Sequence, residues 1–155
     1  MNRLEALRSV IDAQLLSRSS DEDTRCGFVH LYGVSATAAL LARMRGLDEV
    51  VAAAAGMLHD LVSYESGDPA NHASRSAHRA RQILATLDAF DDQEVDWIVS
   101  SILHHSDKDV VHGPYDELLK DADVLQHDLY NPELEAHPRH AERRARLRDR
   151  LRSQS

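Results

Sequence analysis

The chain has 155 residues, which suits one domain with a sizeable core and leaves too little length for most multidomain architectures. Hydrophobic residues make up 43% of it and aromatic residues only 5%, so we expect an interior built from Ala, Leu, Val and Ile. The formal net charge of −8 argues against a general nucleic-acid or membrane-surface binder and favours a small, metabolite-sized substrate.

The first two predicted elements are helices. Leucine and isoleucine recur at steps of three and four over residues 4–15, which predicts an amphipathic helix. The serines and acids of residues 19–23 are typical of a helix N-terminus, so a second helix is expected to start there. It should run to about Arg45, because Gly46 stands where a glycine commonly ends a helix.

The next segment predicts two more helices separated by a loop. Asp48 can cap a third helix through residues 50–64, a stretch rich in alanine. Residues 65–71 contain a Gly-Asp-Pro run and are expected to form a loop. Asn71 can then cap a fourth helix over residues 72–87.

The second half of the chain continues in the same way. Asp91 or Asp92 opens a fifth helix, residues 105–114 read as a loop that ends in Gly-Pro, and a sixth helix follows over residues 115–130. No stretch shows the alternation typical of a strand, so the predicted class is all-α, a compact bundle of about six to seven helices. The tail from about His137 is rich in arginine. Its interspersed acids and apolar residues favour a helix that rests on this acidic protein, or on the second copy in a homodimer, over a nucleic-acid arm.

Cysteine usage and hydropathy restrict the compartment. A single cysteine, Cys26, cannot form an internal disulfide, and the first ten residues carry charge where a secretion signal needs an apolar run. The longest apolar stretch without charge, Val50 to Leu58, is shorter than the roughly 18 residues that cross a bilayer. We therefore expect a cytoplasmic protein without a membrane span.

Histidines and acids carry the chemistry of this sequence. His59 and Asp60 are adjacent and follow an apolar run, so an imidazole and a carboxylate could converge on one ion. A core of Ala and Leu must satisfy any polar groups that point inward, and a divalent ion satisfies several at once. The other predicted helices offer four further candidates: His30, His72, His105 and Asp123.

The order of these residues resembles the HD-domain superfamily of metal-dependent phosphohydrolases. The family pattern is a lone histidine, an adjacent His-Asp pair and a late aspartate, and this chain supplies His30, His59, Asp60 and Asp123. GMLHDL and KDADVL resemble the surroundings of the last two motifs, and the second comparison selects Asp123 over Asp121. The resemblance implies one HD domain over residues 1–155, with its motif core at about 21–132 and an arginine-rich helix at 133–155.

Two further histidines resemble the extra pair of the six-ligand branch of this superfamily. In that branch the first metal would be held by His30, His59, Asp60 and Asp123, and the second by His72, His105 and a bridging Asp60. The neighbouring His104 is the competitor for the place of His105, and His127, one turn beyond Asp123, could support that aspartate. Nitrogen and oxygen ligands of this kind suit one or two divalent ions, iron or manganese first, with cobalt, nickel or magnesium as alternatives.

One position departs from the family pattern. Many HD phosphohydrolases carry Lys or Glu three residues after the aspartate of the pair, and this chain has Ser63 there. Other cations are candidates to neutralise a phosphate. Arg75 lies three residues after His72, Lys108 three after His105, and Lys120 three before Asp123. With Asp60, these three cations are the candidate catalytic residues.

The resemblance implies a phosphohydrolase acting on a nucleotide or another small phosphorylated metabolite through a metal-activated water. Two alternatives stay open. The same six ligands serve dinuclear-iron oxygenases of the superfamily, and a ligand-binding HD module could keep the fold without turnover.

Overall fold

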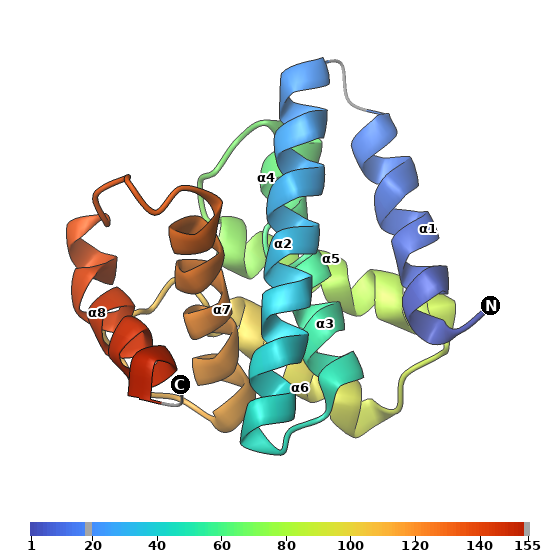
Figure 1. Cartoon of the computed structure of the whole chain (residues 1–155). Coiled ribbons are helices and arrows are strands. Elements are labelled where there is room, and N and C mark those ends of the chain that lie inside the picture. The colour runs from blue at the N-terminus through green and yellow to red at the C-terminus, as the bar shows by residue number, and fades with distance from the viewer. Residues whose placement is uncertain (18–19, 154–155) are drawn as a thin grey trace.

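A computed structural model gives the fold and describes residues 1–17 and 20–153. That part of the chain contains helices and no strand, which confirms the all-α class (Figure 1). The helices are α1 (Arg3–Leu16), α2 (Asp21–Arg45), α3 (Glu49–Leu58), α4 (Leu61–Ser66), α5 (His72–Leu87), α6 (Asp92–His104), α7 (Pro114–Tyr130) and α8 (Pro138–Ser153). Ser19, at the start of the predicted capping run, lies outside the described residues.

Helix ends that carry a strong local signal lie where the sequence places them. The side chain of Ser20 accepts from the amide of Asp23 at the start of α2, and that of Asp48 accepts from the first turn of α3. Asp91 and Glu94 form a reciprocal capping box at the start of α6. Gly46 ends α2 with φ of 68°, a left-handed conformation that glycine adopts without strain.

Two local predictions are wrong. The helix expected over residues 50–64 is interrupted at the His-Asp pair, where Asp60 has φ of −119° and ψ of 12°, and α4 begins one residue later. The interruption places both side chains of the pair at the end of α3 instead of about 100° apart on one continuous helix. Asn71 precedes α5, but its φ is 51° and its side chain caps nothing, because the backbone there turns through the left-handed region.

The central helix α2 packs against α3 and α7, while α5 and α6 pack together and α6 also meets α3 and α7. Alanines and leucines fill the core between them, as the composition predicts. Close approach of α2 and α3 depends on Gly56, because a Cβ there would lie 2.6 Å from the Cα of Ser35. This contact brings His30 on α2 to the end of α3, where His59 follows Gly56 by three residues.

The arginine-rich tail is helix α8, which lies against α7 on the outer side of the molecule (Figure 1). Leu147 is buried, and the guanidinium of Arg143 donates to carboxylates of Glu117 and Asp121 on α7. The tail therefore packs on its own chain through an apolar contact and ion pairs. None of the described helices has the length and apolar character needed to cross a membrane.

Candidate metal centre

Four imidazoles and two carboxylates meet where five segments of the bundle converge. His30 comes from the middle of α2, and the His-Asp pair comes from the break between α3 and α4. His72 is the first residue of α5, His105 caps the C-terminus of α6, and Asp123 lies on α7. We call this set the six-residue cluster: His30, His59, Asp60, His72, His105 and Asp123.

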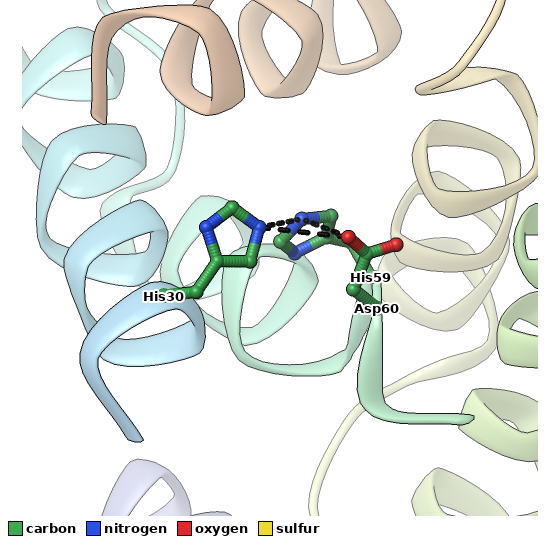
Figure 2. A group of neighbouring side chains, drawn as sticks. All are labelled: His30, His59 and Asp60. Atoms are coloured by element: carbon green, nitrogen blue, oxygen red, sulfur yellow. Dashed lines mark hydrogen bonds and ion pairs between the residues drawn. The ribbon is translucent and has the colours of Figure 1, made fainter. Parts of the chain in front are cut away.

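The first half of the cluster consists of His30, His59, Asp123 and Oδ2 of Asp60, and its two imidazoles are buried. Nε2 of His30 lies 3.1 Å from Nε2 of His59, and each of these atoms is 3.5 Å from Oδ2 of Asp60 (Figure 2). Oδ1 of Asp123 lies 3.5 Å from the His30 nitrogen and 3.8 Å from the His59 nitrogen. Ligand atoms about 2.1 Å from one ion in a tetrahedral array are about 3.4 Å apart, so these separations fit a shared ion.

The second half of the cluster consists of His72 and His105, which face the other oxygen of the Asp60 carboxylate. Oδ1 of Asp60 lies 3.4 Å from Nε2 of His72 and 3.2 Å from Nε2 of His105. These two nitrogens are 3.2 Å from each other. Asp60 thus presents one oxygen to each half, as a bridging carboxylate would.

Hydrogen bonds on the far side of each ring fix which nitrogen points inward. Each Nδ1 lies between 2.7 and 3.0 Å from an oxygen that can only accept, so Nδ1 carries the proton and Nε2 keeps its lone pair. The acceptors are the side chain of Gln126 for His30 and the backbone carbonyls of Gly56, Pro69 and Ile102 for His59, His72 and His105. An imidazole oriented in this way is typical of a metal ligand.

The inward atoms repel one another unless a cation lies among them. When the rings are neutral, two pairs of Nε2 lone pairs face each other at 3.1 and 3.2 Å, and neither nitrogen of a pair can donate to the other. Oδ1 of Asp60 is buried and has no hydrogen-bond donor within the described residues. One or two divalent ions would satisfy these nitrogens and carboxylate oxygens together, so the donor set fits a metal site.

The protonation states of His59, Asp60 and Asp123 suit metal binding, whereas burial lowers the pKa of His30 less than the neighbouring Asp60 and Asp123 carboxylates raise it. Burial lowers the pKa of His59 to about 4, so this imidazole is neutral at physiological pH. Burial alone would raise the pKa of Asp60 and Asp123. The neighbouring imidazoles hold the pKa of Asp60 well below its usual range. The pKa of Asp123 is lowered as well, and the Lys108 ammonium makes the largest contribution to that lowering. Neutral imidazoles and ionised carboxylates are the forms that bind metal.

Of the three predicted phosphate-binding cations, the structure brings Lys108 to the cluster. Its Nζ donates to Oδ2 of Asp123 at 2.7 Å and to the backbone carbonyl of His105 at 2.6 Å. Lys108 and Asp123 are both buried. The ammonium therefore joins a ligand of the first half to the backbone that carries a ligand of the second.

The structure does not bring Arg75 and Lys120 to the cluster. Arg75 donates to the backbone carbonyls of Asp68 and Ala70. Lys120 donates to the carbonyl of Val110 and contacts His112 in the same loop and Glu117 on its own helix. Spacing of three residues puts a Cα on the face of a ligand, but a long side chain can turn its head group toward loop carbonyls. Both cations fasten a loop that borders the cluster, residues 67–71 or 105–113.

The two adjacent histidines near the end of α6 are separated clearly. His105 points into the cluster, whereas Nδ1 of His104 lies 2.7 Å from Oδ1 of Asp116 and its ring stacks on His112. Sequence reasoning missed Gln126 and Ser106, whose hydroxyl oxygen lies 3.0 Å from Nε2 of His72. The only sequence signal for these two residues is their position: Gln126 lies three residues after Asp123, and Ser106 directly follows His105.

A sequence model of the HD domain family matches residues 27–128, well over half of the chain. The matched segment contains the whole six-residue cluster. Comparisons with curated proteins and with solved structures found no match.

Proposed function

The chain belongs to the HD domain family, and from this premise we propose that it is a metal-dependent phosphohydrolase acting on a nucleotide or another small phosphorylated metabolite. One observation carries the proposal. Four imidazole nitrogens, each oriented by a hydrogen bond at Nδ1, converge with two ionised carboxylates, one of which faces both halves of the cluster.

The residues divide the work of holding metal. His30, His59, Asp123 and one oxygen of Asp60 would hold a first ion. His72, His105 and the other oxygen of Asp60 would hold a second. Such ions, when bound, polarise a phosphoryl oxygen as Lewis acids. They also lower the pKa of a bound water, so that it can act as a nucleophile at neutral pH. Asp60 keeps the two halves in register, because a single rigid carboxylate contributes to both.

Lys108 acts as a positioning residue in this proposal. Its ammonium holds Asp123 in place through one hydrogen bond and the C-terminal turn of α6 through another. It also offsets the negative charge that two buried carboxylates bring to the site. A positive charge so close to the cluster further favours an anionic substrate.

A pocket beside the first half supports a nucleotide as substrate. It has a volume of about 150 Å³ and lies next to His30, between the side chains of Tyr64, Tyr130 and His127. Arg25, on its rim, is the cation of this pocket. Aromatic rings stack on a planar base and a guanidinium binds phosphate, so the pocket suits a base that carries a phosphate toward the cluster.

The test is release of inorganic phosphate from a panel of nucleoside mono-, di- and polyphosphates and of sugar phosphates, with iron or manganese supplied without oxygen. We expect release by the wild type, background release by Asp60→Ala, and near wild-type release by the control His104→Ala, whose ring faces Asp116. Phosphate release that persists in Asp60→Ala would contradict the proposed site. Oxygen consumption without phosphate release, when the same panel is assayed again in air, would replace the proposal by the oxygenase alternative, and tight binding without either would replace it by the binding module.

A further inference from the structure

A seventh candidate ligand adjoins the cluster on its solvent side. His127 lies one helical turn after Asp123 on α7, and its side chain is 62% exposed, whereas that of Asp123 is 10% exposed. Single nitrogen or oxygen atoms of His30, Asp123 and His127 all lie within 4.8 Å of one another. The rings of His30 and His127 have their centres 4.9 Å apart.

The geometry does not suit a simple supporting role for His127. Its Nε2 is 3.6 Å from Oδ1 of Asp123, beyond the range of an ordinary hydrogen bond. Within the described part of the chain the imidazole has no hydrogen-bond partner. The same separation fits two ligands of one ion, since tetrahedral ligands at about 2.1 Å from a metal are about 3.4 Å apart.

The surroundings of His127 add a second observation. Its side chain lines the pocket next to His30 and Tyr64, and it also lines a neighbouring pocket of about 250 Å³ beside His137 and His140. The imidazole therefore borders the first half of the cluster and both of these pockets.

We propose that His127 is a further, displaceable ligand of the metal held by His30, His59, Asp60 and Asp123, and that a phosphate oxygen takes its place when substrate binds. This inference rests on the proposed metal site. The two features of His127 have separate consequences: proximity to Asp123 and His30 lets it bind the ion, and exposure lets it leave.

The experiment compares His127→Ala with His78→Ala, which removes an exposed histidine from α5, away from the cluster. Competition with a chelator should show that His127→Ala binds the first ion at least about 10-fold more weakly. Removal of a group that only orients a ligand already costs about that much metal affinity, and removal of a ligand should cost no less. The visible spectrum of the Co²⁺-loaded protein should change, and free imidazole should restore both the affinity and the spectrum. Inorganic phosphate should bind the metal-loaded variant several-fold more tightly than the wild type, because no imidazole competes.

The outcomes separate this inference from the proposed function. If the wild type retains two ions and His127→Ala equals His78→Ala in affinity and spectrum, His127 is no ligand. A loss that free imidazole fails to rescue also overturns it, since the ring would then act by supporting the fold. Phosphate binding that is equal or weaker in the variant overturns the displacement. A wild type that holds no metal overturns the proposed function itself.

Discussion

The two halves of the cluster are built differently. His30 and His59 come from α2 and the end of α3, helices pressed together at Gly56, and the His59 side chain is fully buried. His72 starts a helix, has a side chain that is 30% exposed, and is oriented by a loop carbonyl, that of Pro69. Helix packing thus fixes the first half, whereas the second depends on loops at helix ends. We expect the first ion to be held more tightly and the second to exchange more readily.

The largest effect is expected where the halves share a residue. Asp60→Ala removes both carboxylate oxygens and leaves four facing imidazoles without the anion between them. Metal content should fall from about two ions per chain to near zero, and phosphate release should fall to background. Elemental analysis and the release assay measure the two effects, with His104→Ala as control. A variant that keeps one full ion would break the claim that Asp60 bridges.

Single-histidine variants sharpen the difference between the halves. His59→Ala should empty the first half and also destabilise the fold, because it opens a cavity beside α2. His72→Ala should remove only the second ion and leave thermal stability near that of the wild type, since its side chain is partly exposed. Metal per chain and the melting temperature of each variant test this. Loss of both ions in each of the two variants would mean that the ions bind as one cooperative unit.

Lys108 links the halves, and the loss of stability on its removal should depend on whether metal is bound. In metal-free protein, Lys108→Ala leaves the buried carboxylate of Asp123 unpaired, which costs about 3–5 kcal/mol of the free energy of unfolding. Bound metal compensates that charge, so the loss should shrink in the loaded protein. Urea unfolding with and without metal measures both values. The exposed Arg43–Glu49 pair supplies the control, since Arg43→Ala should leave the free energy of unfolding nearly unchanged in either state. An equal loss with and without metal would contradict the link.

The smallest effect is expected from the loop before α5. Arg75→Ala frees the carbonyls of Asp68 and Ala70 and so loosens the turn whose Pro69 carbonyl orients His72. The second ion should bind a few-fold more weakly and the first ion unchanged. Chelator competition, compared with Arg81→Ala on the same helix, is the measurement. An unchanged second site would show that the loop carbonyl orients His72 without help from Arg75.

The sequence predicts the all-α fold well where local chemistry decides. Ser20, Asp48 and Asp91 cap helices through their own side chains, so their positions can be inferred without tertiary structure. The interruption at Asp60 could not be inferred in this way. Residues 50–64 continue as an apolar, helix-favouring run, and the break depends on packing around the cluster.

The site shows the same division. The resemblance to the HD-domain superfamily predicts the ordered histidines and aspartates of the cluster, and the structure brings all six together. The cations were placed by spacing alone, which defines a helix face but not where a long side chain ends. Lys108 therefore reaches Asp123, while Arg75 and Lys120 turn to loop carbonyls. Only its position three residues after Asp123 marks Gln126, because an amide that orients a histidine is otherwise indistinguishable in sequence from a surface residue.

The central claim is that one shared carboxylate joins two metal-binding halves of unequal strength. The most direct measurement is metal content per chain by elemental analysis during stepwise dialysis against a chelator, on protein purified without oxygen. We predict about two ions at the start and a plateau at about one, as the half with His72 and His105 empties first. No metal at any stage, even after loading with iron or manganese, would contradict the account.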